Sequence, residues 1–343
     1  MATISEVARL AQVSVSTVSY AISGSRPISE ETRQRVFAAM EELGYRPHAI
    51  ARGLASRRSR ILALLFPFSE RGLGITELEF VTSAADAAMA RGYHMVLWPA
   101  EMRSADDLRN LTQQSLVDGV VVMEVQQADL RVAALRELGT PFTLIGRCAD
   151  NTGLDFVDVD FETTIHDAVA YVVRLGHTNI GYIAHSPAEF AAGYGPTVRS
   201  CAAFEQELGK LGLRGALRLC DSSPREGALA LDLLYSDLPE MSALLIMNDR
   251  AIPGVQQALI DRSLQIPDDL SLVTIATSAR VGEMVRPALT TFAPPSIELA
   301  RLGVELLIDK LENDHHRSRQ TLISCRLLER GSTAPLRTQP LPA

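Results

Sequence analysis

A run of hydroxyl-bearing side chains near the N-terminus carries the clearest chemistry in the sequence. Residues 13–21 read Val-Ser-Val-Ser-Thr-Val-Ser-Tyr-Ala, and helical spacing turns Val18 and Ala21 towards the inside of a small domain. Hydroxyl groups donate and accept hydrogen bonds, so a helix of this kind can read base edges in the major groove of DNA. The side chains predicted to face the base edges are Val15, Ser16, Thr17 and Tyr20.

The flanking residues predict three short helices, whose packing must hold this DNA-reading helix in position. Thr3 and Glu6 have the spacing of a capping box before a helix from Ile4 to Ala11. Two helices joined by a tight turn, followed by a third, form the helix-turn-helix arrangement, in which the second helix enters the groove. The predicted second and third helices run over Val15–Ile22 and Glu30–Leu43, with Ser14 and Ser29 as caps and Gly44 as the stop.

The distribution of charge separates this segment from the rest of the chain. The whole chain has a net charge of −8, but residues 1–60 hold nine arginines against five glutamates, a net charge of +4, which leaves −12 for the remainder. A basic segment is attracted to the phosphate backbone of DNA, whereas an acidic body is repelled by it. The sequence therefore predicts a DNA-binding head on a body that does not bind DNA.

The same segment resembles the headpiece of the lactose-repressor (LacI) family of transcription regulators. The resemblance rests on residues 3–8 (Thr-Ile-Ser-Glu-Val-Ala), 13–19, 28–36 (Ile-Ser-Glu-Glu-Thr-Arg-Gln-Arg-Val) and 43–47 (Leu-Gly-Tyr-Arg-Pro). It implies a sequence-specific regulator, most commonly a repressor, that binds a near-palindromic double-stranded DNA operator as a homodimer. The DNA-binding residues predicted on this basis are Thr3, Ser5, Ser14, Val15, Ser16, Thr17, Tyr20, Arg26, Thr32, Ala51, Leu54 and Ala55.

Residues 48–56 are similar to the hinge helix of this family, in which a leucine at the place of Leu54 wedges into a central base step of the minor groove. Nine residues are too few for a stable isolated helix, and Gly53 weakens this one further. We therefore expect the segment to fold only with a partner hinge and DNA, where the wedge bends the duplex. The alternative is that Leu54 is only an apolar residue of a linker.

One departure from the family falls within the recognition helix. The family commonly has an arginine after Thr-Val-Ser, whereas this chain has Tyr20. A tyrosine can donate one hydrogen bond or pack on a thymine methyl group, but it cannot make the bidentate contact that arginine makes with guanine. The sequence thus predicts an operator half-site that differs from those of its relatives.

Beyond residue 60, continuous apolar strands alternate with amphipathic helices, a pattern typical of a parallel sheet covered on both faces. Two such series predict two doubly wound α/β lobes, about 61–158 and 159–289, similar to periplasmic binding proteins. The chain should recross near 290–292, a helix over 296–312 should return to the first lobe, and a strand over about 320–328 should finish the second. The expected domains are an all-α headpiece over 1–47, a hinge and linker over 48–60, and a two-lobed effector-binding and dimerisation domain over 61–335.

Two facing lobes place their strand-end loops around one cleft, which is the usual position of a small ligand in open α/β sheets. Segments 175–180, 247–249 and 289–291 resemble landmarks of the LacI effector domain, which implies a small-molecule effector, in many members a sugar. Arginine, asparagine and aspartate suit the hydroxyl groups or carboxylates of such a ligand. The predicted effector-binding residues are Phe68, Ser69, Arg147, Asp160, Arg199, Ser222, Asn248 and Asp249.

Alternatives stay open at this cleft. Asp160 and Asp249 could instead cap helices or form salt bridges between the lobes. The ligand class is open as well, because three residues replace an aromatic ring, a carboxylate and a polar side chain that relatives often have, namely Ser222, Ala276 and Pro294. Stacking surface could come instead from Phe190, Tyr194 and Trp98.

The sequence gives little support to an enzyme or to an exported solute-binding protein. It has no Walker loop, no Gly-x-Gly-x-x-Gly after a strand, no Gly-x-Ser-x-Gly elbow and no metal-spaced histidine cluster, so we expect no catalytic residue, metal or cofactor. The four cysteines are far apart, which predicts neither a zinc site nor disulfides. Without an apolar signal core or a run near the roughly 20 residues that cross a bilayer, we expect a cytoplasmic protein with no membrane partner.

Overall fold

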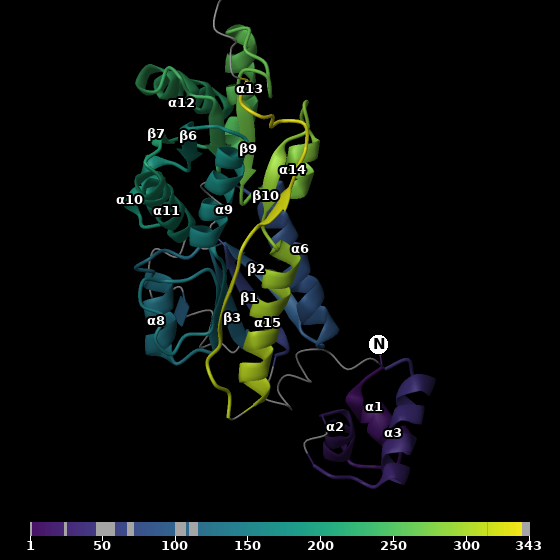
Figure 1. Ribbon diagram of the computed structural model, residues 1–343. Helices are drawn as coiled ribbons and strands as arrows, with labels where there is room; N and C mark the ends of the chain where they lie inside the picture. Colours follow the sequence, from purple (N-terminus) through teal and green to yellow (C-terminus); the bar gives the residue numbers. More distant parts are fainter. Residues whose placement is uncertain are drawn as a thin grey trace, which may run out of the picture.

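The computed structural model describes residues 2–23, 26–45, 59–66, 72–99, 108–109, 116–313 and 315–337 (Figure 1). Three N-terminal helices precede two α/β lobes, which confirms the predicted fold class. The predicted hinge, with Ala51, Leu54 and Ala55, and the predicted effector-binding residues Phe68 and Ser69 lie outside the described residues. Among the helices that are described, none is long and apolar enough to span a bilayer.

The headpiece helices begin where the sequence places hydroxyl caps. The backbone N–H groups of Glu6, Thr17 and Thr32 donate to the caps three residues earlier, at 3.3, 3.1 and 3.2 Å. Glu6 also accepts from the backbone N–H of Thr3 at 2.8 Å, which completes the predicted capping box. The helices are α1 (Ile4–Leu10), α2 (Val15–Ser23) and α3 (Glu30–Glu42).

A small apolar core holds these three helices together. Val7 from α1, Val18 from α2 and Val36 from α3 are fully buried, and Ala21 and Ala39 fill the space between them. The inward positions of Val18 and Ala21 are as predicted. Because every large core residue comes from a different helix, the core fixes α2 against the other two helices and leaves its N-terminal side exposed.

The first lobe is built on a six-stranded parallel sheet in the order β11-β5-β4-β3-β1-β2. Helices α6 and α15 pack against each other and lie side by side in Figure 1. Strands β1, β3 and β4 are buried and mainly apolar because helices cover the sheet, whereas the edge strand β11 is partly exposed. The elements are β1 (Ile61–Phe66), α6 (Ile75–Ala90), β2 (His94–Pro99), β3 (Gly119–Met123), α8 (Leu130–Leu138), β4 (Phe142–Ile145), β5 (Phe156–Val159), α15 (Ser296–Glu312) and β11 (Gln320–Ile323).

The second lobe repeats this plan with the order β12-β10-β9-β8-β6-β7, in which only the β10–β12 pair is antiparallel. Close packing of α12 on α13 requires small residues, because a Cβ on Gly254 would lie 1.6 Å from the carbonyl oxygen of Pro224. The elements are α9 (Phe161–Arg174), β6 (Asn179–Ala184), α10 (Pro187–Ala191), α11 (Gly195–Leu211), β7 (Arg214–Leu219), α12 (Pro224–Asp237), β8 (Ala243–Ile246), η1 (Asp249–Ala251), α13 (Ile252–Asp261), β9 (Ser271–Ile275), α14 (Ala279–Glu283), β10 (Thr290–Ala293) and β12 (Arg326–Leu328).

The chain passes between the lobes three times, and the last passage differs from the prediction. The expected single strand over 320–328 is two strands, of which β11 pairs in parallel with β5 of the first lobe and β12 pairs with β10 of the second. The amide of Cys325 donates to the Thr164 hydroxyl at 3.0 Å instead of continuing a sheet ladder. The predicted return of the helix over 296–312 to the first lobe is confirmed.

Candidate functional site

The N-terminal side of α2 presents the predicted DNA-reading residues. The hydroxyl of Ser14 lies 2.8 Å from that of Thr17 and caps the helix, so both side chains are held at its first turn. Val15 is 44% exposed and Ser16 is also exposed, so neither contributes to the headpiece core. This turn therefore offers hydroxyl groups and one apolar side chain to a partner, together with the positive end of the helix dipole.

Tyr20 is coupled to an arginine beyond the end of its helix. The guanidinium carbon of Arg26 lies 5.2 Å from the centre of the Tyr20 ring, within range of a cation–π interaction. Arg26 is exposed and Tyr20 is partly exposed. The two residues form one unit, in which the ring of Tyr20 holds a positive charge at the edge of the recognition helix.

The other described headpiece candidates lie at the starts of α1 and α3. Thr3 caps α1, and the hydroxyl of Thr32 lies 2.8 Å from that of Ser29 at the start of α3. Ser5 is exposed in the first turn of α1. The structure thus gathers polar hydroxyl groups at the N-terminal ends of the headpiece helices, where backbone N–H groups also point outwards.

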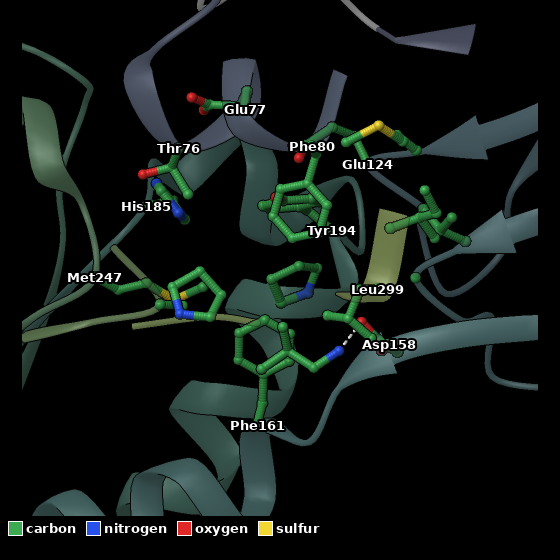
Figure 2. A pocket seen from close by; sticks show the side chains of 18 of the residues that line it. Thr76, Glu77, Phe80, Glu124, Asp158, Phe161, His185, Tyr194, Met247 and Leu299 are labelled. Carbon is green, nitrogen blue, oxygen red and sulfur yellow. Dashed lines mark hydrogen bonds between the residues drawn. The ribbon is translucent and has the colours of Figure 1, made fainter. Parts of the chain in front are cut away.

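A cavity lies between the two lobes, at the ends of their parallel strands. Its free volume is about 100 Å³, and its wall is formed by residues of α6, the loops after β3, β4, β8 and β9, and the starts of α9, α11 and α15. Figure 2 shows Phe80, Phe161 and Tyr194 around an apolar interior with carboxylates at its margin. This is the position predicted for a small ligand.

A buried carboxylate and two arginines form part of this wall. Asp158 is 4% exposed, and its Oδ2 lies 3.3 Å from Nε of Arg147 and 3.7 Å from Nη1 of Arg199. Burial raises the pKa of Asp158 to about 7, although both arginines oppose this shift. Burial also lowers the pKa of Arg199. Asp158 therefore changes its charge near neutral pH, at the border between the lobes.

We expect Asp158→Asn to flatten the pH dependence of stability. Because the folded protein favours the neutral carboxyl, its contribution to stability is complete below a pH of roughly 4 and is lost as the pH rises through about 7. A rise in pKa from 3.8 to about 7 corresponds to roughly 4 kcal/mol. Melting curves of the effector domain should show the wild type losing stability relative to the variant over this window. Parallel pH profiles would contradict the assignment.

The remaining predicted effector residues are distributed between the cavity wall and its support. Asp249 lines the cavity. Asn248 is fully buried and donates to the carbonyl of Cys220 at 2.7 Å, while the Ser222 hydroxyl lies 3.4 Å from Oδ1 of Asn248. Asp160 caps α9 by accepting from the backbone N–H and the hydroxyl of Thr163. Asn248 and Ser222 thus brace the loop that carries Asp249.

Several wall residues escaped the sequence analysis. Thr76, Glu77 and Phe80 come from the first turns of α6, and His185 comes from the end of β6. Tyr194, predicted as one possible source of stacking surface, lines the cavity together with Ala276 and Pro294. In the sequence, the α6 residues could be recognised only as the start of a helix that follows β1. That position does not show which of their side chains face the opposite lobe.

The lobes are joined on both sides of the cavity. On one side, the backbone N–H of Gln127 donates to Gly193 at 2.7 Å and that of Gly195 donates to Val125 at 3.0 Å. On the other side, Ser278 of the second lobe donates through its hydroxyl to Oε1 of Glu79 on α6, at 2.6 Å. We call this Glu79–Ser278 contact the interlobe latch. These bonds describe lobes that are closed on each other.

A helix-turn-helix headpiece followed by two lobes around a cavity is the arrangement typical of a ligand-binding regulator of transcription. The family model for bacterial regulatory proteins of the lacI family matches residues 3–48, and that for periplasmic binding protein-like domains matches residues 169–333. The chain thus combines a DNA-binding region of the lacI family with a periplasmic binding protein-like domain.

Relatives and solved structures of this class match nearly the whole chain. The HTH-type transcriptional repressor PurR of Shigella sonnei is 28% identical over 339 residues, which cover 97% of each chain. The lac repressor dimer bound to operator and the anti-inducer ONPF has a TM-score of 0.80 and 22% identity, and covers 97% of this chain and 99% of its own. The complex of the regulator CelR with cellobiose has a TM-score of 0.69 and 24% identity, and the match covers 97% of this chain and 100% of the CelR chain. These two structures share the fold.

Proposed function

We propose that this protein represses transcription by binding a near-palindromic operator through its headpiece, and that a small molecule in the interlobe cavity controls this binding. The observation that carries the proposal is the exposed hydroxyl face of α2, held by a basic headpiece on the same chain as a two-lobed domain with a cavity. Anisotropy with labelled operator should show tight binding that weakens steeply with salt, because phosphate contacts release counterions.

We propose direct DNA contacts for the described residues Thr3, Ser5, Ser14, Val15, Ser16, Thr17, Tyr20, Arg26 and Thr32. Their support is their position at helix starts or beside α2, where six of them are exposed and Thr17, Tyr20 and Thr32 are partly exposed. The hydroxyl groups fit base edges and phosphate oxygens, and Arg26 adds a charge that phosphates attract. Ala51, Leu54 and Ala55 complete the proposed set at the hinge.

A homodimer is proposed to place two headpieces on the two halves of the operator. Its support is a groove between α6, α14 and α15, around which Leu78, Met284 and Ile297 are 47%, 71% and 69% exposed. Large apolar side chains gathered on one face mark an interaction surface, and a two-fold pair would match the symmetry of a palindrome. Because α6 forms both this groove and the cavity wall, a ligand that moves α6 would change the dimer.

We propose that Asp249 contacts the effector directly. Arg147 and Arg199 are proposed to contribute indirectly, by holding the carboxyl group of Asp158 in the cavity wall. Asn248 and Ser222 brace the Asp249 loop, and Asp160 fixes the start of α9 beside the cavity. Phe68 and Ser69 are proposed to complete the site. Thermal shift with candidate ligands tests this set, because a cavity ligand stabilises the folded protein by mass action.

We also propose that the protein is not an enzyme and that it acts in the cytoplasm, where its operator would be. The support is the family, whose named relative is a transcriptional repressor. Turnover of any cavity ligand, measured beside operator binding, discriminates between the two classes.

Tyr20→Arg is expected to change the base preference at one base pair of each half-site. The arginine gains a bidentate contact to guanine, worth about 1–3 kcal/mol of discrimination, while Arg26 loses its aromatic platform. Selection of operators from random DNA measures this change. Tyr20→Phe serves as the control because it keeps the ring under Arg26, and an unchanged consensus in the arginine variant would exclude a reading role.

Leu54→Ala is expected to weaken specific operator binding by roughly 1–3 kcal/mol, the size expected when a well-placed apolar contact is removed, without changing the melting temperature. Its proposed role is to wedge into the central base step, so the variant should also bend the duplex less. Anisotropy and a bending assay on the same operator measure both effects. Wild-type affinity together with wild-type bending would support the linker alternative.

A further inference from the structure

The charges on the cavity wall are almost all of one sign. Among the described residues that line it, four are carboxylates, none is a lysine or an arginine, and His185 is the one imidazole. Glu77 comes from the start of α6, and Glu124 follows β3. Asp158 and Asp249 come from opposite lobes, at the ends of β5 and β8. The cavity is therefore enclosed by acceptors contributed from both lobes.

The two arginines nearest the cavity lie beside Asp158 and do not line the cavity themselves. Arg147 donates to both oxygens of Glu162, at 2.8 and 2.6 Å, and so points to a carboxylate outside the wall. Arg199 donates to the backbone carbonyls of Arg147 and Cys148, at 2.7 and 3.1 Å. Each guanidinium group keeps one buried nitrogen without a hydrogen bond, Nε of Arg147 and Nη1 of Arg199, and these lie 3.3 and 3.7 Å from Oδ2 of Asp158. Asp158 lines the cavity and neither arginine does, so a ligand in the cavity meets the carboxyl group of Asp158 rather than a guanidinium group.

Two of the carboxylate oxygens are buried and receive no hydrogen bond. Oδ2 of Asp158 is one, because the arginine nitrogens at 3.3 and 3.7 Å do not have hydrogen-bond geometry. Oε2 of Glu77 is the other. Glu77 has the sequence position from which a glutamate reaches back to the helix start, yet Gly74 at that start has no side-chain cap. A buried acceptor without a donor is costly, so both oxygens are suited to a ligand that brings N–H groups.

The apolar part of the wall suits the same ligand. Phe80, Phe161 and Tyr194 line the cavity (Figure 2), and aromatic faces attract cations. In such a water-poor space the repulsion between a carboxylate ligand and the wall would be much stronger than in water. A neutral polyol would donate hydrogen bonds to some of these acceptors, but only a cation would add a favourable charge interaction with the carboxylates of the wall.

From these observations we propose that the effector is a small organic cation, a molecule with an ammonium group whose N–H donors reach Glu77 and Asp158 across an aromatic-walled cavity. This inference rests on the proposed function, in which the cavity is the effector site. A sugar belongs to the class when it carries an amine. Glu77 and Asp158 belong to the first lobe and Asp249 to the second, so a cation that also reached Asp249 would hold the lobes closed.

The test uses matched probes that differ in charge and little in shape. The series are glucosamine, glucose and glucose 6-phosphate; putrescine, 1,4-butanediol and succinate; and choline, 3,3-dimethylbutanol and 3,3-dimethylbutyrate. Each is added at millimolar concentration to the full chain, and both the melting temperature and the operator affinity are measured in the same buffer. We expect at least one cation to raise the melting temperature by several degrees and to change operator affinity, while its neutral and anionic counterparts do neither.

Two variants locate the effect. Glu77→Gln should weaken binding of the responding cation by about 10-fold, the loss expected for one charged hydrogen bond, whereas Glu137→Gln, on the exposed face of α8, should leave it unchanged. The proposal is overturned if a neutral or anionic probe stabilises more than its cation, if no cation shifts the melting temperature, or if both variants behave alike. Failure of the full chain to bind any operator would instead count against the proposed function.

Discussion

Val18→Asp is expected to abolish operator binding while the two lobes stay folded. Val18 is fully buried at the centre of a core of seven buried residues, all of them valine or alanine. Burying an unpaired carboxylate costs several kcal/mol, and a domain this small has little stability to lose. The headpiece should unfold, and operator affinity should fall by more than about 100-fold, the equivalent of roughly 3 kcal/mol.

The control for this experiment is Ala38→Asp, which adds the same charge to an exposed position of α3. Repulsion of phosphate alone should weaken binding by only a few-fold, because an exposed charge is screened. The melting transition of the lobes should be the same in both variants. If Val18→Asp binds operator as tightly as Ala38→Asp, the headpiece is not the DNA reader that the structure indicates.

Glu79→Ala should shift the lobes towards an open arrangement by about 30-fold. The variant removes the charged acceptor of the Ser278 hydroxyl, which is buried and would keep only the hydrogen bond that it accepts from the Arg280 backbone N–H. A loss of about 2 kcal/mol corresponds to that factor. The same carboxylate accepts from Ser296 at the start of α15, at 3.0 Å. The latch therefore connects the cavity wall, the exposed groove and the helix that returns to the first lobe.

Hydrogen exchange at the Ser278 amide measures this opening directly, since that amide donates to the Thr76 hydroxyl at 2.9 Å across the lobes. Faster exchange should be accompanied by a changed operator affinity, and the direction of the change tells whether closed lobes hold or release DNA. Glu79→Gln keeps an acceptor without the charge, so an intermediate effect is expected. If exchange at the Ser278 amide were unaltered in Glu79→Ala, the interlobe latch would not be what holds the lobes closed.

The headpiece and the two lobes could be predicted because their signals are local. Thr3, Ser14 and Ser29 cap helices wherever they precede a helical run, and periodic apolar residues decide which side is buried. The division of residues 320–328 into β11 and β12 could not be predicted. The two strands pair with different sheets, and the Cys325 amide between them donates to the Thr164 hydroxyl, a contact that exists only in the folded protein.

The candidate site was less accessible to sequence reasoning than the fold. Arg147 and Arg199 were placed near the cavity by their resemblance to family positions, but their commitment to Glu162 and to backbone carbonyls depends on long-range geometry. Glu77 gave no signal, because a glutamate in the first turn of a helix is usually explained by the helix dipole. Its unpaired oxygen becomes visible only when both lobes are in place.

The most direct measurement of the central claim is selection of operators from random DNA with the full chain, followed by anisotropy on the enriched sequence. We expect a two-fold symmetric consensus, binding that weakens steeply with salt, and loss of that binding in Val18→Asp. The headpiece would not be a two-fold DNA reader if the selection enriched no symmetric sequence. The same would follow if the wild type and Val18→Asp bound the consensus equally well.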